Sequence, residues 1–299
     1  MITAQHLTKR YGDRAAVDDI SFVARPGRVT GFLGPNGAGK STTMRMLCGL
    51  TTPTSGTSTI LGKPFRALPC PGRSIGVLLD ASAQHAGRTG RETLALSARL
   101  MGLPAARVDE TLAQVGLTDQ EARGRTRTYS LGMRQRLGLA HALLGDPAVL
   151  MLDEPANGLD PAGIRWMRDL LRGFAAEGGT VLLSSHLLRE MEAVCDDLVI
   201  IGGGRVLAHD SAAALLSGPS TRVRSEDDGA LASALAGAGH DVERADDGSL
   251  ATTAATHEVG RVALAAAIAL TELRAATTTG LEQLFFDTTA PHGREEISA

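Results

Sequence analysis

Apolar residues occur in short runs along the chain, separated by turn residues, and most runs have the length of a strand. Four of them are continuous, which is typical of strands buried on both faces of a parallel sheet: 29–33, 74–79, 148–152 and 180–184. Other runs are more broken and also favour strands: 2–7, 17–23, 197–201 and 205–207. The pattern predicts an α/β fold.

Apolar residues at helical spacing fill the gaps between these strands. We expect helices at 41–47, 130–144, 161–177 and 187–195. A separate group lies between two of the continuous strands, where the helical stretches 89–101 and 105–115 each end at a glycine. This group predicts an inserted helical subdomain at about residues 81–140.

The composition shifts at Gly218-Pro219-Ser220, which predicts a boundary between a domain at 1–217 and a second at 218–289. The second stretch reads strand, helix, two strands joined by a turn, helix, strand and short helix. The expected ranges are 221–225, 229–235, 241–244, 250–253, 258–270, 272–277 and 281–286. This order resembles a small α+β domain of the ferredoxin-like type. Residues 290–299 are predicted to be a disordered tail.

One strand-to-helix connection contains a phosphate-binding pattern. It fills G-x-x-x-x-G-K-[ST] and runs Gly34, Pro35, Asn36, Gly37, Ala38, Gly39, Lys40, Ser41 and Thr42. The glycines permit a tight turn in which backbone N–H groups approach phosphate, and the helix N-terminus adds a positive field. Lys40 is expected to reach the β- and γ-phosphates, and Ser41 to bind Mg²⁺. An ordinary glycine-rich turn is the alternative, which the strand, the helix and the lysine together disfavour.

Two carboxylates, Asp153 and Glu154, follow directly after the run 148–152. Acidic side chains at the end of a buried strand are costly unless something cationic lies there. Alternation along a strand points them in different directions, so Asp153 is expected to hold a metal and Glu154 to polarise an attacking water. His186 follows the strand 180–184 at the same sheet edge. A histidine there is often structural, but the shared edge favours catalysis.

Two further positions have both a structural and a functional interpretation. Tyr11 lies in a polar turn of a chain with only 3% aromatic residues. It is either a half-buried loop residue or a flat face on which adenine stacks. Ser130 is well placed as the N-cap of the helix at 130–144. A helix start with Ser130 and Gly132 at its tip is also an anion site.

Composition narrows the setting of the protein. The chain has 299 residues, of which 43% are hydrophobic, and its net charge is −3. That near-balance argues against a general binding surface for nucleic acid or anionic lipid. The three cysteines show no metal or disulfide spacing, which suits a reducing cytosol. The chain start lacks the pattern of an export signal, and the most apolar stretch, 262–270, is too short to span a bilayer. We therefore expect a soluble cytosolic protein.

Taken together, residues 1–217 resemble the nucleotide-binding subunit of ATP-binding cassette (ABC) transporters. The motifs follow the family's order: 34–42 correspond to the Walker A loop, 149–153 to the Walker B strand and Glu154 to the catalytic glutamate. Residues 130–135 (Ser-Leu-Gly-Met-Arg-Gln) occupy the place of the signature, 158–160 that of the D-loop and His186 that of the switch histidine. Tyr11 falls at the family's adenine-stacking aromatic, which favours its functional interpretation. The resemblance implies a P-loop NTPase (RecA-like) core.

The resemblance also implies a mechanism with ATP and Mg²⁺. Two subunits would face each other head to tail and bury two ATP molecules, and one full set of motifs predicts a homodimer. The implied catalytic residues are Lys40, Glu154 and His186, and the implied metal ligands are Ser41, Asp153 and Asp80. The implied nucleotide contacts are Tyr11, Gly34, Pro35, Asn36, Gly37, Ala38, Gly39, Lys40, Ser41, Thr42, Ser130, Gly132 and Asp160. Of these, Ser130 and Gly132 would act on the ATP held by the other subunit.

The chain departs from the family pattern at two positions. Leu131 replaces a signature glycine, which makes Ser-Leu-Gly-Met similar to the variant of drug and antibiotic exporters that resemble daunorubicin resistance ATPases. Asp80 stands where the family has a glutamine that links Mg²⁺ to the membrane subunit. A carboxylate there could still hold a metal-bound water, and the nearby Gln84 is an alternative. The stretch 281–286 also resembles the closing segment of these exporter subunits.

The predicted function is that of an ATPase that powers export of a drug, antibiotic or lipid-like small molecule through a separate membrane permease. The permease would dock on the helical subdomain and hold the subunit at the cytoplasmic face of the membrane. A soluble ABC-type ATPase acting on nucleic acid or the ribosome is the alternative. The single cassette and the charge balance argue against it, so no nucleic-acid partner is expected. A small-molecule kinase would share the phosphate loop but not the signature or the Asp-Glu pair.

Overall fold

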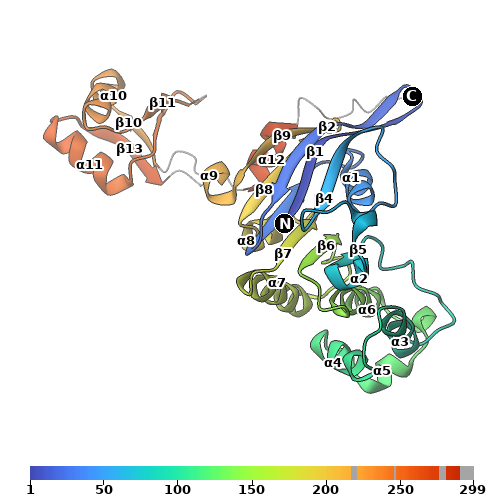
Figure 1. The fold of residues 1–299 in the computed structure, drawn as a ribbon. Helices are drawn as coiled ribbons and strands as arrows, with labels where there is room; N and C mark the ends of the chain where they lie inside the picture. The colour runs from blue at the N-terminus through green and yellow to red at the C-terminus, as the bar shows by residue number, and fades with distance from the viewer. Residues whose placement is uncertain (217–220, 246, 276–280, 290–299) are drawn as a thin grey trace, which may run out of the picture. The chain divides into compact units, whose positions relative to one another are not determined.

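The computed structural model describes residues 1–216, 221–245, 247–275 and 281–289. The chain forms two compact units (Figure 1). The first unit comprises Met1–Ser211 and the segment that begins at Asp287, and the second comprises Ala212–Phe286. The division falls shortly before the boundary that the sequence suggests at Gly218.

A six-stranded sheet forms the centre of the first unit, in the order β5-β6-β7-β3-β8-β9. Its strands are β3 (Arg28–Leu33), β5 (Ile75–Leu78), β6 (Val149–Asp153), β7 (Thr180–Ser184), β8 (Asp197–Gly202) and β9 (Arg205–Ser211). All neighbouring pairs are parallel except β8 and β9. The strands β6 and β7 are almost completely buried, as their continuous apolar runs predict, and β8 is buried along its whole length. Because parallel strands end at one edge, the residues that follow β3, β6 and β7 meet there.

An antiparallel sheet of the order β2-β1-β4 lies in the same unit. Its strands are β1 (Ile2–Tyr11), β2 (Arg14–Ala24) and β4 (Ser55–Ile60). β1 and β2 are longer than the expected ranges 2–7 and 17–23, because paired backbones hydrogen bond whether or not their side chains are apolar. His6 and Asp19 have φ of 52° and 58°, and the pairing of the two strands is irregular between Ala4 and Arg10. These irregularities interrupt the alternation on which the sequence prediction depended.

The helices between β5 and β6 form the expected helical subdomain. They are α3 (Gly90–Leu100), α4 (Ala106–Gln114), α5 (Asp119–Arg123) and α6 (Leu131–Leu143), which lie close together in Figure 1. Thr89 and Thr118 begin α3 and α5 with capping boxes, in which Glu92 and Glu121 bond back to the cap. The sequence analysis missed α5, α2 (Pro71–Ser74) and the 3₁₀ turns at Phe65–Ala67 and Thr126–Thr128, because one turn leaves no periodic pattern.

The main core lies between the two sheets and α1 (Lys40–Leu47). It contains Ile2, Ile20, Phe22, Phe32 and Met44, and the rings of Phe22 and Phe32 are 5.2 Å apart. Two further helices of this unit are α7 (Pro161–Ala176) and the shorter α8 (Leu188–Val194). Among the described residues, no helix has the length and apolar character needed to cross a membrane.

The second unit is a small domain with an antiparallel sheet in the order β11-β12-β10-β13. Its elements are α9 (Ala212–Leu216), β10 (Thr221–Ser225), α10 (Asp228–Gly237), β11 (Val242–Arg244), β12 (Leu250–Thr252), α11 (Thr256–Ala265), β13 (Leu270–Ala275) and α12 (Leu281–Thr289), which ends beyond the unit. Leu231 and Leu235 of α10 and Val259 of α11 pack on Val223 and Leu250 of the sheet.

The order of elements in this unit agrees with the sequence pattern, but the boundaries of the second helix and of the strand after it do not. The helix expected at 258–270 ends at Ala265, because Ala267 turns the chain with φ of 55° and β13 begins at Leu270. The turn could not be predicted, because the alanine-rich run around it contains no glycine, proline or other turn residue. Residues 276 and 277 of the expected last strand, and the expected tail at 290–299, lie outside the described residues.

Candidate active site

The phosphate-binding pattern forms a tight loop between β3 and α1. Gly37 and Gly39 have φ of 79° and 106°, which other residues rarely adopt. Glycine is also required by close packing, since a Cβ at Gly34 would lie 2.5 Å from the carbonyl oxygen of Ile201. A Cβ at Gly39 would lie 2.6 Å from the carbonyl oxygen of Ala16. The loop therefore keeps its backbone N–H groups close to the start of α1.

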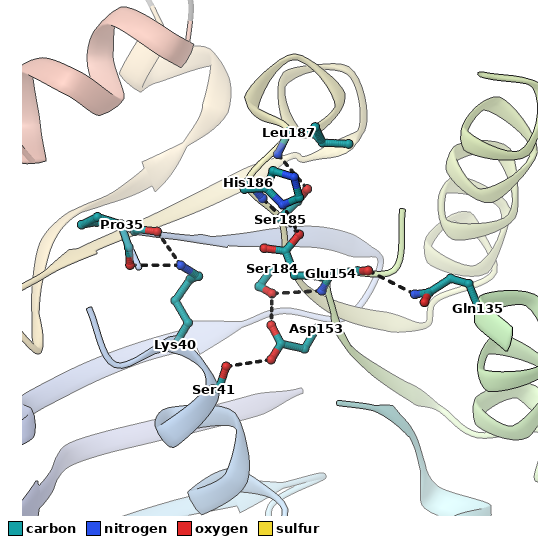
Figure 2. Close-up of polar contacts among 11 residues, drawn as sticks. Pro35, Lys40, Ser41, Gln135, Asp153, Glu154, Ser184, Ser185, His186 and Leu187 are labelled. Carbon is teal, nitrogen blue, oxygen red and sulfur yellow. Dashed lines mark hydrogen bonds and ion pairs between the residues drawn. The ribbon is translucent and has the colours of Figure 1, made fainter. Parts of the chain in front are cut away.

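Lys40 is the first residue of α1, and its side chain folds back over the loop. Its Nζ donates to the carbonyl oxygen of Gly34 and, at 3.2 Å, to that of Pro35 (Figure 2). Burial lowers the pKa of the Lys40 ammonium, while the Glu154 and Asp153 carboxylates offset part of that shift. A phosphate that enters the loop would replace two neutral carbonyl partners with a charged one.

Asp153 ends β6 and connects three elements. Ser41 Oγ of α1 donates to its Oδ2 at 2.9 Å, and Ser184 Oγ of β7 donates to its Oδ1 (Figure 2). The contact with Ser184 follows from the register of the sheet, in which these two residues are Cα partners. The carboxylate is thus fixed from both sides, with one oxygen beside the Ser41 hydroxyl.

Glu154 has an unusual backbone conformation, with φ of 51°. Four hydrogen bonds hold its peptide groups, one of which runs from the Asn157 N–H to the Glu154 carbonyl oxygen at 3.2 Å. Its N–H donates to Ser184 O at 3.1 Å and to Ser184 Oγ at 3.2 Å, and its carbonyl oxygen accepts from Gln135 Nε2 at 3.1 Å. A non-glycine residue in this region is strained and persists only where its surroundings fix it. Such strain is concentrated at functional sites.

His186 and Glu154 form a close pair. His186 Nδ1 lies 2.7 Å from Glu154 Oε2, and the His186 N–H donates to the same oxygen at 3.2 Å (Figure 2). The Ser185 hydroxyl accepts from the Leu187 N–H at 3.0 Å and shapes the backbone on the other side of His186. His186 therefore orients the Glu154 carboxylate through two contacts.

A cavity of about 480 Å³ lies over the phosphate loop. Its lining residues come from the loop, the acidic pair and the hairpin between β1 and β2: Tyr11, Arg14, Ala16, Asn36, Gly37, Gly39, Lys40, Ser41, Thr42, Asp153 and Glu154. Tyr11 is 57% exposed, and Lys9 Nζ lies 5.0 Å from its ring centroid. An exposed aromatic ring at the end of a polar cavity suits the stacking interpretation rather than that of a half-buried loop residue.

Ser130, Gly132 and Asp160 do not line this cavity. Ser130 caps α6, where its Oγ accepts from the Met133 N–H at 3.2 Å, and Asp160 caps α7 through the Gly163 N–H at 2.8 Å. The two helix starts touch each other. A Cβ at Gly132 would lie 2.7 Å from the Gly158 carbonyl oxygen, and a Cβ at Gly158 would lie 2.3 Å from Leu131 Cγ.

Asp80 is also separate from the acidic pair. It follows β5, and its Oδ1 accepts from the Ser82 N–H at 2.7 Å and the Ser82 hydroxyl at 2.6 Å. These bonds lower the pKa of the Asp80 carboxyl. Asp80 lines a second cavity of about 360 Å³ together with Gln84, His85 and His141. In this conformation its carboxylate is engaged locally.

Comparisons with known proteins agree with this geometry. A family model described as "ABC transporter" matches residues 17–157. The bacitracin transport ATP-binding protein BcrA of Bacillus licheniformis is 43% identical over 210 residues, which cover 69% of this chain and 68% of that protein. The Nod factor export ATP-binding protein I of Ralstonia nicotianae is 39% identical over 212 residues, which cover 70% and 66%. This chain belongs to the ABC transporter ATP-binding proteins.

A solved structure of the "ATP binding subunit of ABC transporter" has a TM-score of 0.67 and 29% identity, and covers 72% of this chain and 91% of that chain. The fold is therefore that of an ABC ATPase, with the P-loop core and the helical subdomain expected from sequence. Residues 219–282 match a domain of unknown function, DUF8746. The second unit is thus a separate recurring module.

Sequence reasoning missed three residues of this ABC ATPase site. Ser184 and Gln135 fix Asp153 and Glu154, and Arg14 lines the cavity next to Tyr11. Ser184 could have been found from the pairing of β6 with β7, had the register been known. Gln135 lies in the signature stretch 130–135, but that stretch gave it no role of its own. Arg14 carries no signal, because a polar residue in a turn is ordinary.

Proposed function

We propose that this ABC ATPase powers the export of a small molecule through a separate membrane permease, and that it works at the cytoplasmic face of the membrane. The observation that carries the chemistry is the assembly of Lys40, Ser41, Asp153 and Glu154 around one cavity. His186 lies behind this group, 2.7 Å from the Glu154 carboxylate. The direction of transport follows from the relatives, one of which is named for export of Nod factor and another for transport of bacitracin.

The residues take distinct parts in phosphoryl transfer to water. The loop N–H groups and Lys40 hold the phosphates, and Tyr11 stacks on adenine. Glu154, oriented by His186, polarises the attacking water and accepts its proton. Once the bond between the β- and γ-phosphates breaks, the charge that passes to the leaving oxygen lies beside Lys40.

Mg²⁺ is expected between Ser41 and Asp153. A hydroxyl and a carboxylate oxygen 2.9 Å apart are hard donors, and Mg²⁺ commonly takes few protein ligands while it keeps waters and substrate phosphates. This agrees with the absence, among the described residues, of any cluster of three acidic, histidine or cysteine ligands. Mg²⁺ would neutralise charge on the transferring phosphate. Asp80 would be the third protein ligand, and one of its carboxylate oxygens is bonded to Ser82 in this conformation.

Two subunits would form two composite sites. The starts of α6 and α7 carry Ser130, Gly132 and Asp160 but lie outside the cavity of their own chain, which supports a function across a dimer. The contact of Leu131 with Gly158 joins these two helix starts, so that the signature and the D-loop would approach the second subunit as one surface. ATP would bridge the subunits, and hydrolysis would remove the bridge.

The domain division follows the same proposal. Residues 1–217 would be the nucleotide-binding domain, and 218–289 an accessory domain. The strand order β11-β12-β10-β13, with all neighbours antiparallel, supports a ferredoxin-like fold for the latter.

Glu154→Gln tests this proposal, because it removes the base and leaves the shape of the site. In detergent extracts of the native cell with Mg-ATP, the tagged variant should retain ATP, form dimers and co-purify with one polytopic membrane protein. Wild-type protein with ADP is the control: it should retain no ATP and should not form the ATP-bridged dimer. Recovery of the variant with ribosomes or DNA instead would move the work of the ATPase away from transport.

A further inference from the structure

β13 is an edge strand of the second unit's sheet. It pairs with β10 on one side, and within the described ranges no strand pairs with its other side. Four of its six residues are exposed. An edge strand presents N–H and C=O groups that can pair with another strand of matching sequence. What the edge accepts is therefore determined by its side chains.

Two exposed leucines lie beside this edge. Leu273 of β13 is 39% exposed, and it points to the helix-covered face because its Cα partner in β10 is the core residue Val223. Its Cδ2 is 4.0 Å from the Cβ position of Gly260 in α11. Leu264 lies one helical turn after Gly260, on the same side of α11, and is 81% exposed. Leu264 and Leu273 form an unusual apolar surface for an otherwise polar edge.

The residues on either side of Leu273 carry opposite charges. Glu272 and Arg274 point to the open face of the sheet, and Arg274 Nε lies 2.8 Å from Glu272 Oε1. Both belong to a network with β10 and the turn between β11 and β12: Arg222 and Arg274 contact Asp247, and Arg224 contacts Glu272. The network joins Glu272 and Arg274 of the edge strand to β10 and to the β11–β12 turn.

We propose that β13 is a self-association edge, at which the β13 strands of two copies of this chain pair antiparallel about Leu273. This register places Leu273 opposite the partner's Leu273, Glu272 opposite the partner's Arg274, and Arg274 opposite the partner's Glu272. The charge pattern is thus complementary to itself under a twofold axis.

Neighbouring registers are excluded by the same side chains. A shift of the centre to Glu272 or Arg274 sets like charges opposite each other, which is destabilising. If the twofold axis passed between two residues of β13, a side chain on the helix-covered face would lie opposite one on the open face. Directly opposed residues of antiparallel strands point to the same face, so this register is not possible. In the proposed register both α11 helices lie on one side of the joined sheet, where Leu264 and Leu273 of the two chains bury one another.

This association does not involve the nucleotide cavity and goes beyond the proposed function. It would keep two subunits together while their ATP sites are empty, so that closure on ATP becomes a rearrangement within a dimer. The effective concentration of one cassette near the other would then be set by the chain between the units rather than by diffusion.

A charge exchange tests the pairing in the full chain without nucleotide. Sedimentation equilibrium of wild-type protein should give a dimer. Glu272→Arg alone and Arg274→Glu alone should each weaken it about tenfold, because both faced pairs become like-charged. An equimolar mixture of the two variants should restore dimers, since the introduced charges then face opposite ones. Arg244→Glu, on the far edge strand β11, is the matched control and should dimerise as wild type does.

Disulfide formation provides a second measurement that also detects weak association. In a Cys70→Ser background, whose other cysteines are buried, Leu273→Cys should form a disulfide-linked dimer on oxidation. Thr271→Cys and Ala275→Cys should cross-link when mixed but not alone. Monomers at all concentrations without a Leu273→Cys disulfide, or a disulfide from Leu273→Cys to a permease, would overturn the proposal. The charge variants combined with Glu154→Gln should still dimerise on ATP, which separates this proposal from that of the ATP-bridged dimer.

Discussion

The hydroxyl group of Ser184 links the two acidic residues of the site, and its removal tests how the sheet positions them. It donates to Asp153 Oδ1 and accepts from the Glu154 N–H. In Ser184→Ala the Glu154 N–H keeps the Ser184 carbonyl oxygen at 3.1 Å, so the main loss is the bond to the Asp153 carboxylate. A hydrogen bond to a charged group contributes about 1.5–3 kcal/mol, and residue 184 is fully buried, which keeps water from replacing it.

We therefore expect the free energy of unfolding to fall by about 2 kcal/mol in Ser184→Ala. If the transition state for ATP hydrolysis is destabilised by the same amount, about 2 kcal/mol, kcat falls about thirtyfold. The KM for ATP should change little, because the phosphate loop and Lys40 do not contact Ser184. Urea unfolding and steady-state ATP hydrolysis at saturating Mg-ATP measure the two quantities separately.

Thr30→Val is a matched control for this experiment. Thr30 lies in the adjacent strand β3 and is equally buried, but its hydroxyl has no hydrogen-bond partner among the described residues. Its replacement should leave kcat unchanged and stability equal or higher. A wild-type kcat in Ser184→Ala would refute the argument that this hydroxyl positions Asp153.

Three further predictions follow from other parts of the chain. Tyr11→Ala should weaken ATP binding about tenfold in calorimetry, whereas Tyr11→Phe, which keeps the ring, should bind as wild type does. Gly39→Ala should abolish ATP binding and lower the unfolding free energy by about 2 kcal/mol or more, because its φ is 106° and the new Cβ meets the Ala16 carbonyl oxygen; normal binding would contradict this. Hydrogen bonds from Ser249 lower the pKa of Asp247 from 3.8 to about 2. The ionised carboxylate therefore stabilises the second unit above about pH 4, and this contribution is lost as the pH falls from 3.8 toward 2. Asp247→Asn should speed hydrogen exchange of the β10 amides at pH 7, with a difference from wild type that shrinks toward pH 2.

The parts of the site that sequence could predict are those that leave a local pattern. The phosphate loop and the pair Asp153-Glu154 each follow a continuous apolar run, and a buried parallel strand with polar residues at its end is readable without a structure. His186 follows a parallel strand that ends at the same edge of the sheet, which places it beside Glu154. The helical subdomain was predictable for a similar reason, because α3 and α4 carry apolar residues at helical spacing.

Contacts that depend on register or on a turn could not be read from the sequence. Ser184 ends an apolar run, as several other residues do. Only the alignment of β6 with β7 shows that it lies opposite Asp153. Asp80 was expected near Mg²⁺ only from the family resemblance, and its short side chain bonds to Ser82 two residues away. The contact between Leu131 and Gly158 joins two loops that are far apart in sequence, and no local pattern indicates it.

The backbone at Glu154 explains how two adjacent carboxylates come to have different partners. Two like charges side by side repel each other, so each carboxylate needs a partner of its own. The left-handed conformation of Glu154 turns its side chain toward His186, while Asp153 stays in the strand and contacts Ser41. That conformation costs about 1–3 kcal/mol. It is offset by the hydrogen bond that the Glu154 N–H donates to Ser184 and by the one that the Glu154 carbonyl oxygen accepts from Gln135. Any acidic pair at the end of β6 supplies the charge, but the separation of a metal-binding carboxylate from a base requires this turn, so Ser184 and Gln135 are as much a part of the site as the residues they hold.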